Sequence, residues 1–386
     1  MISPELQELL EPLERFEAIR RRAARLGDRL ADLAYANPYE GIQQGARAAL
    51  RRALDDDRPL ALQYSPFGGQ TLIRRAVADS LAASHGLEFA FGDVVLTPGA
   101  MSALHLALRA AGEPGDEVIV PVPCWLDYPL YARFLSLAPV LVPLPAPDFD
   151  LDLNALDEAI SERTCAVLLS HPSNPTGRCY EASTLAGLAE TIARAEARVG
   201  REVTLIADET HRDFTAPGQY HSASAFVDRT VVVYSFGKYH FMQGQRVGYA
   251  AVSPRHPQRE ALGEELVRWT RITGIATPTA VMQRALPDLL ELRHDQHWLG
   301  EWQRRLCDEL SQSGYGLVEP DATMFIYVET PPGYDDMDFV AELAGKGVLA
   351  LPAPVFHHRG YFRLSLTGSE HMLRQATPIL KELAPA

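Results

Sequence analysis

One lysine of the sequence stands where its amine could do covalent chemistry. Lys238 follows the apolar and β-branched run 231–234, which predicts a buried strand that gives way to a turn. Burial disfavours the ammonium form and frees the lone pair to condense with a carbonyl as a Schiff base. Ser235 and Arg246 flank the lysine and supply the hydroxyl and guanidinium donors that bind a phosphate. The candidate ligand is an aldehyde that carries a phosphate, and the alternative is a solvated surface lysine.

A glycine turn earlier in the chain offers a second anion-binding element. The short apolar run 94–97 predicts a strand, and an alanine- and leucine-rich stretch after Gly99 predicts a helix. The backbone N–H groups of Ala100 and Met101 would then point at an anion from the positive end of the helix dipole. Many strand–turn–helix units contain such a turn, so this signal gains weight only from its position before Lys238.

Three further predicted strands end in side chains that suit a planar, polar ligand. Trp125 follows the first and can stack on a ring, with packing in the core as the alternative. Asn174 follows the second, in a turn that we expect Pro175 to hold rigid as a cis peptide. Asp208 ends the third. Because the carboxyl ends of parallel strands meet at one edge of a sheet, these residues are expected to share a site.

Taken in order, these motifs resemble the fold type I pyridoxal-phosphate (PLP) enzymes, in particular the class I and II aminotransferases related to aspartate aminotransferase. The resemblance extends from Asn37 to Leu366. It implies that Lys238 holds PLP as a Schiff base and then moves the Cα proton, while Asp208 pairs with the pyridine nitrogen and keeps a low pKa. The implied reaction moves an amino group between an L-amino acid and a 2-oxo acid.

The resemblance also assigns the remaining cofactor contacts. Trp125 would pack on the pyridine ring, and Asn174 and His211 would donate to its phenolic oxygen. The phosphate would be bound by Ala100, Met101, Ser235 and Arg246. The family further implies a homodimer in which Tyr64 of each subunit reaches the phosphate of the cofactor in its partner.

Substrate contacts follow from the same resemblance. Arg363 lies within an apolar predicted strand, where a cation is costly without an anionic partner. The family context implies a clamp on the substrate α-carboxylate, with Asn174 nearby; a structural salt bridge is the alternative. Asn37 begins an Asn-Pro segment that would run beside the substrate. Tyr39, Tyr64 and Tyr128 are candidates for setting the side-chain preference.

Two positions depart from the aminotransferase pattern. His211 stands where most members have a tyrosine, and the Asp-Glu-x-His pattern resembles the cystathionine β-lyase-like C–S lyases of the same fold. A histidine there could titrate. Gly237 stands where many members have a second serine, which removes one phosphate donor. A PLP-dependent C–S β-lyase, or another eliminating or decarboxylating deaminase, is therefore the alternative enzyme. A PLP-fold ligand-binding protein is the alternative outside catalysis.

These residues require an α/β fold that positions them. We predict an N-terminal helix and arm over residues 1–45, with helix over 3–34, which belongs to the smaller domain. A large PLP-binding domain with a mainly parallel sheet would span 46–284, and a small α+β domain 285–386. The helical pattern is expected to continue from Ala250 to about Arg284. Residues 322–328 alternate like a half-buried strand.

Composition narrows the range of partners. The chain has 386 residues and a net charge of −14, which argues against nucleic acid and anionic membranes as partners. The four cysteines are widely spaced, so neither a zinc site nor a disulfide framework is indicated, and no metal is expected. We expect no signal peptide and no membrane span, and hence a cytoplasmic protein with amino acid and 2-oxo acid substrates.

Overall fold

A seven-stranded, mainly parallel sheet forms the centre of the larger domain in this computed structural model, which describes residues 2–39, 41–295 and 297–385. The strand order is β2-β8-β7-β6-β5-β3-β4, and β8 alone runs antiparallel to its neighbours. The strands are β2 (Val94–Thr97), β3 (Glu117–Val122), β4 (Ala138–Pro143), β5 (Thr164–Ser170), β6 (Thr204–Asp208), β7 (Thr230–Ser235) and β8 (Gly248–Val252). The predicted fold class is confirmed.

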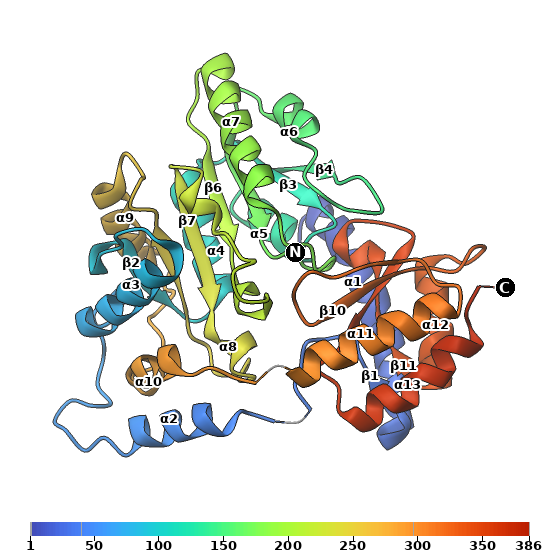
Figure 1. The fold of residues 1–386 in the computed structure, drawn as a ribbon. Coiled ribbons are helices and arrows are strands. Elements are labelled where there is room, and N and C mark those ends of the chain that lie inside the picture. Colours follow the sequence, from blue (N-terminus) through green and yellow to red (C-terminus); the bar gives the residue numbers. More distant parts are fainter. Residues whose placement is uncertain (1, 40, 296, 386) are drawn as a thin grey trace.

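The central strands are buried on both faces because helices cover both sides of the sheet (Figure 1). In β7, Val231 and Val233 pack with the helices of one face, whereas Val232 and Tyr234 pack with those of the other. The first face carries α4 (Ala100–Ala111), α5 (Tyr128–Phe134) and α9 (Arg259–Ile272). The second carries α2 (Gln44–Leu54), α3 (Thr71–His85), α6 (Leu153–Ala159), α7 (Ala182–Val199) and α10 (Ala280–Glu291).

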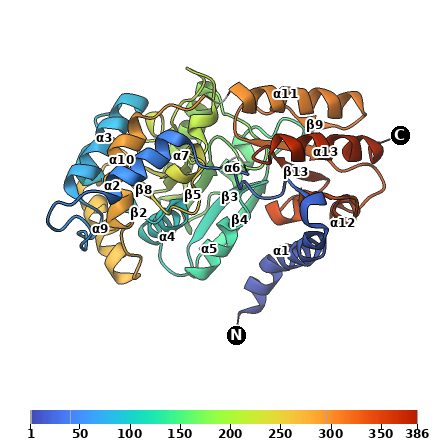
Figure 2. The ribbon, with the colours of Figure 1, turned by 90° about the horizontal axis from the view of Figure 1, so that it is seen from below.

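A four-stranded antiparallel sheet in the order β12-β13-β10-β9 organises the smaller domain. Its strands are β9 (Leu317–Val318), β10 (Phe325–Glu329), β12 (Leu351–Pro352) and β13 (Tyr361–Ser365). The helices are α11 (His297–Gln312), α12 (Asp336–Lys346) and α13 (Glu370–Glu382). The N-terminal α1 (Pro4–Ala23) lies against α12, and β1 (Ala31–Asp32) pairs with β11 (Val348–Leu349) (Figures 1 and 2). Both ends of the chain therefore belong to this domain.

Short helical turns complete the fold: η1 (Ala24–Arg29), η2 (Phe91–Asp93), η3 (Arg212–Phe214), η4 (Ala223–Ala225), α8 (Phe236–Tyr239) and η5 (Ala353–Phe356). None of the helices that the structure describes combines the length and apolar character needed to cross a membrane.

The N-terminal helix is shorter than predicted. Ser3 caps it: its Oγ accepts a hydrogen bond from the backbone N–H of Leu6 over 3.3 Å. The α-helix ends at Ala23 rather than continuing to residue 34, because Gly27 takes a positive φ of 56° that no α-helix contains. The chain then enters β1.

Two other local predictions were wrong. Residues 250–252, which we predicted to begin a helical stretch, instead end β8; a Cβ on Gly248 would clash with the backbone O of Tyr234, so only glycine allows this strand to lie so close. Residues 325–328 of β10 are buried on both faces instead of one, because the helices of the small domain and the large domain enclose them. The domain boundaries remain a prediction, and residue 284 lies inside α10.

Candidate active site

Lys238 lies in α8, directly after the buried strand β7. The chain can turn closely here because Gly237 has no side chain; a Cβ there would lie 3.1 Å from the Cα of Gln243. Desolvation of the ammonium, followed by the positive charges of Arg363 and Arg246, lowers the pKa of Lys238 to about 8. About a tenth of this amine is therefore uncharged at pH 7, far more than for an ordinary lysine.

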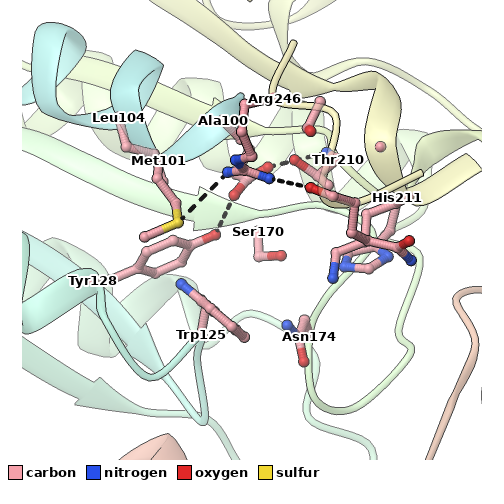
Figure 3. Close-up of a pocket in the computed structure, with 15 residues that line it drawn as sticks. Ala100, Met101, Leu104, Trp125, Tyr128, Ser170, Asn174, Thr210, His211 and Arg246 are labelled. Atoms are coloured by element: carbon pink, nitrogen blue, oxygen red, sulfur yellow. Dashed lines mark hydrogen bonds between the residues drawn. The ribbon is translucent and has the colours of Figure 1, made fainter. Parts of the chain in front are cut away.

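Lys238 lines a pocket of about 190 Å³. Figure 3 shows this pocket. Its walls come from the carboxyl ends of β5, β6 and β7, the start of α4 and the connection between β3 and α5. Trp125, Tyr128 and Met101 lie along one side of the view in Figure 3, and His211 lies on the other. The lining residues are Ala100, Met101, Leu104, Trp125, Tyr128, Ser170, Asn174, Asp208, Thr210, His211, Ser235, Gly237, Lys238, Gln243 and Arg246.

One end of the pocket gathers anion-binding groups. Gly99, with a φ of 87°, precedes the first residue of α4, so the N–H groups of Ala100 and Met101 stand at a free helix N-terminus. The guanidinium of Arg246 packs over this turn, and its Nη2 would lie 2.7 Å from a Cβ on Gly99. Ser235 lines the same pocket. The structure thus brings the four predicted phosphate-binding residues of one chain together.

Asp208 lies at the buried end of β6 and accepts two hydrogen bonds. The hydroxyl of Tyr128 donates to Oδ2 over 2.7 Å, and the backbone N–H of Thr210 donates to Oδ1 over 3.0 Å. Desolvation outweighs these bonds and raises the pKa of Asp208 above its ordinary value. The low pKa that we predicted applies to a carboxylate paired with a ring nitrogen and stays a prediction; in the chain alone, burial raises the pKa of Asp208.

His211 and Thr210 present unsatisfied polar atoms beside the lysine. The Nδ1 of His211 and the Oγ1 of Thr210 are buried and find no hydrogen-bond partner among the described residues. Desolvation, then the charges of Lys238 and Arg363, hold the pKa of His211 well below its ordinary value. The imidazole is neutral near pH 7 and does not titrate there, contrary to our expectation. A ligand atom in the pocket would satisfy both groups.

Arg363 lies behind the pocket, only 1% exposed, with its guanidinium 3.9 Å from the centre of the Phe325 ring. Its Nη1 donates to Oδ1 of Asn174 over 2.7 Å and its Nη2 donates to the backbone O of Ala34 over 2.8 Å. Burial lowers its pKa to about 9. No carboxylate of the described residues pairs with it, so the structural salt bridge is not found. The peptide bond between Asn174 and Pro175 is cis, as predicted.

Three predicted site residues lie away from the pocket of a single chain. Asn37 and Tyr39 are exposed on the segment after β1, and Tyr64 is fully exposed before α3. The structure also shows contacts that the sequence did not reveal. Tyr128 was a candidate for substrate preference and bonds to Asp208 instead. Gln243 lines the pocket and donates to the backbone O of Ala36 over 2.8 Å; its type and position gave no signal.

These features fit pyridoxal phosphate. The helix N-terminus and Arg246 suit its phosphate, and the amine of Lys238 suits its aldehyde. Asp208 suits a protonated ring nitrogen, and the unsatisfied Nδ1 of His211 suits a ring oxygen. Trp125 offers a flat surface for the ring.

Comparison with known proteins agrees with this chemistry. Residues 32–379 match the family described as aminotransferase class I and II. The probable aspartate aminotransferase of Methanocaldococcus jannaschii is 26% identical over 343 residues, which cover 87% of this chain and 88% of that protein. The aspartate/prephenate aminotransferase of Thermus thermophilus is 28% identical over 366 residues, with coverage of 91% and 90%.

The fold comparison gives the same result. The crystal structure of an amino transferase from Eubacterium rectale superposes with a TM-score of 0.90 at 25% identity, and covers 99% of this chain and 98% of its own. The family match and the superposition both extend over nearly the whole chain, including every strand that contributes to the pocket. The chain belongs to the class I and II aminotransferase family and is a pyridoxal-phosphate-dependent aminotransferase.

Proposed function

We propose that this chain transfers the amino group of an L-amino acid to a 2-oxo acid in the pocket that Lys238 lines. The observation that supports this most directly is the buried amine of Lys238, whose pKa is lowered to about 8 and which lines the same pocket as the carboxylate of Asp208. When bound, pyridoxal phosphate supplies an electron-withdrawing ring that makes the Cα proton of the amino acid acidic.

Lys238 would act as the base of the reaction. As a free amine it accepts the Cα proton at its Nζ atom, and as an ammonium it returns a proton later in the transfer. Its pKa allows both, because an amine with a pKa near the working pH exists in both forms. Desolvation of the ammonium lowers this pKa most, and the positive charges of Arg363 and Arg246 lower it further.

Asp208 would hold a positive ring nitrogen by its negative charge. The hydrogen bonds from Tyr128 and Thr210 fix the orientation of the carboxylate and favour its charged form. A cation at this place would also lower the raised pKa of Asp208. The side-chain N–H₂ of Asn174 remains for a ligand, because Arg363 uses only its Oδ1.

Arg363 would bind the α-carboxylate of the substrate. Its guanidinium is buried, lacks a carboxylate partner among the described residues and leaves Nε without a hydrogen bond. A carboxylate can accept two parallel bonds from such a group. Asn37 and Tyr39 remain proposed substrate contacts near this end, on the segment whose Ala36 carbonyl is bonded by Gln243.

We also propose that the protein is a homodimer, for which the segment before α3 is the main support. Tyr64 is fully exposed, and Leu60, Leu62 and Phe67 nearby are exposed apolar side chains. Such a group of apolar side chains is typical of a protein contact. In the dimer, the hydroxyl of Tyr64 would reach the phosphate site of the partner. A cytoplasmic location remains a prediction from the spaced cysteines, all of which are free thiols.

The Asp-Glu-x-His pattern at 208–211 keeps a C–S β-lyase as the second candidate. Both reactions begin with removal of the Cα proton, so the products must decide between them. The relatives are named for aspartate and prephenate, and we propose these amino donors and acceptors as the first substrates to test.

The test is a single-turnover measurement on protein saturated with the cofactor. Addition of an L-amino acid should release one equivalent of its 2-oxo acid and leave pyridoxamine phosphate on the enzyme. A thioether amino acid that instead yields pyruvate, ammonia and a thiol would show the lyase. Borohydride reduction should attach a pyridoxyl group to Lys238 alone, and a peptide map without that modification would contradict the proposal.

A further inference from the structure

A loop of the small domain holds the segment that carries Trp125. The backbone N–H of Cys124 donates to the O of Phe356 over 3.2 Å, and Nε2 of His357 lies 3.0 Å from the O of Leu126, to which it donates. The two bonds flank Trp125 on either side in the sequence. They join two domains, because residues 124–126 follow β3 of the large sheet and His357 follows η5 of the small domain.

The Trp125 segment depends on such bonds because it has no regular structure of its own. It connects the end of β3 at Val122 to the start of α5 at Tyr128, without helix or strand pairing between them. Trp125 is half-buried and lines the active-site pocket (Figure 3). The backbone O of Trp125 accepts a hydrogen bond from the N–H of Tyr128 over 3.1 Å, and the bonds at Cys124 and Leu126 add the contacts from the small domain.

The backbone of His357 is adapted to this contact. The residue has a φ of 59° and a ψ of 34°, a left-handed conformation that glycine and asparagine adopt easily and other residues adopt at a cost. This conformation ends η5, and the imidazole Nε2 lies within hydrogen-bond distance of the backbone O of Leu126. The hydrogen bond of the side chain offsets part of that backbone cost.

The same loop touches the proposed carboxylate site. The ring of Phe356 lies 4.9 Å from the guanidinium carbon of Arg363, which is also covered by Phe325. A single short loop thus spans from Arg363 to the Trp125 segment.

We infer that His357 is a positioning residue, whose imidazole fixes the Trp125 segment against the small domain and so keeps the ring-stacking surface in register with Arg363. This rests on the proposed function, in which Trp125 contacts the cofactor ring. His357 itself does not line the pocket. Its effect must therefore appear in how tightly and in what orientation the cofactor is held.

The experiment compares His357→Asn, His357→Gly and His357→Gln with wild type. Asparagine and glycine tolerate the left-handed backbone. The asparagine side chain is too short to donate to Leu126, and glycine has no side chain. Glutamine carries an amide N–H at the distance of the imidazole Nε2. His358→Ala is the matched control, because His358 contacts Tyr327 within the small domain, with Nδ1 3.2 Å from its hydroxyl.

We expect His357→Asn and His357→Gly to weaken cofactor binding by roughly three- to tenfold, the effect of one hydrogen bond, and to reduce the visible circular dichroism per bound cofactor. Glutamine should restore both to within about twofold. Thermal unfolding of the cofactor-free protein should change no more than in the His358 control. Equal cofactor affinity and dichroism in wild type and His357→Asn would overturn the inference, as would an equal loss in His358→Ala.

Failure of the proposed function gives a different result. If wild-type protein gained no visible absorption band on addition of pyridoxal phosphate, the proposed function itself would be contradicted, whatever the variants showed. If wild type binds the cofactor normally and the His357 variants match it, only the positioning role is wrong.

Discussion

The guanidinium of Arg363 and the side-chain oxygen of Asn174 are joined by a hydrogen bond of 2.7 Å, which connects β13 of the small domain to the turn after β5 of the large sheet. Arg363 has no carboxylate partner among the described residues, so this amide is its main polar contact from the large domain. The arrangement is poised for an anion, because a buried guanidinium without a negative partner is costly.

Replacement of Arg363 should therefore affect the substrate more than the cofactor. We expect Arg363→Gln to lower kcat/KM for amino acid substrates by about 10²-fold or more, since a buried charge pair with the carboxylate is lost. Steady-state kinetics and cofactor titration measure the two effects separately. Arg178→Gln is the control, because Arg178 pairs with Asp321 of the small domain at 2.8 Å, outside the pocket. A large loss of cofactor affinity with unchanged KM would contradict the assigned role.

The lowered pKa of Lys238 predicts a stability window. Between about pH 8 and 10.5 the unfolded chain holds the lysine proton more tightly than the folded chain, so folding stability of the cofactor-free protein should rise with pH. Lys238→Met removes the desolvated charge and should stabilise the cofactor-free protein by roughly 1–3 kcal/mol at pH 7. That advantage should shrink above pH 8. Denaturant unfolding at several pH values measures it, with the exposed Lys346→Met as control.

A pH-independent advantage would show that packing, and not the charge, limits stability at Lys238. An advantage of equal size in Lys346→Met would show the same, because that ammonium lies on the surface beside Glu382.

The hydrogen bond from Tyr128 to Asp208 leads to a prediction about cofactor affinity. Tyr128→Phe removes the hydrogen bond to Oδ2, which favours the charged carboxylate. We expect the affinity for pyridoxal phosphate to fall by roughly ten- to 150-fold, the range for one hydrogen bond to a charged group. Tyr131→Phe on the same helix is the control, because its hydroxyl donates to Asp127 over 3.0 Å and it does not line the pocket. Equal affinities in the two variants would assign no role to the Tyr128 hydroxyl.

The sequence predicted the sheet, the pocket and most of its residues because short-range patterns carry that information. Apolar runs predicted β5, β6 and β7, and their carboxyl ends placed Asn174, Asp208 and Lys238 at one edge. It could not predict that the pKa of Asp208 is raised in the chain without cofactor, because that depends on burial by distant elements, which outweighs the hydrogen bond from Tyr128.

The failures have a common cause in tertiary packing. Residues 250–252 were predicted as the start of a helical stretch, but Gly248 lets them pair as part of β8 between β2 and β7. The hydrogen bond between His357 and Leu126 joins loop residues that are far apart in the sequence, and no sequence periodicity predicts it.

The neutral state of His211 makes a spectroscopic prediction. Desolvation and the charges of Lys238 and Arg363 hold its pKa far below the ordinary value, so the imidazole of the cofactor-free protein should not titrate between pH 5.5 and 8. Nitrogen-15 NMR of labelled histidines, with the His211 signals assigned by their absence in His211→Gln, measures this directly.

The exposed Tyr64 makes the last prediction, which concerns the dimer. If its hydroxyl reaches the phosphate of the partner, Tyr64→Phe should leave the oligomeric state unchanged and weaken cofactor binding by about three- to thirtyfold. Leu62→Glu on the same segment should instead lower the dimer fraction, because a charge replaces an apolar contact. Light scattering after size exclusion measures the mass. A monomeric wild-type protein would contradict the dimer. Equal cofactor affinity in wild type and Tyr64→Phe would contradict the contact between the Tyr64 hydroxyl and the phosphate.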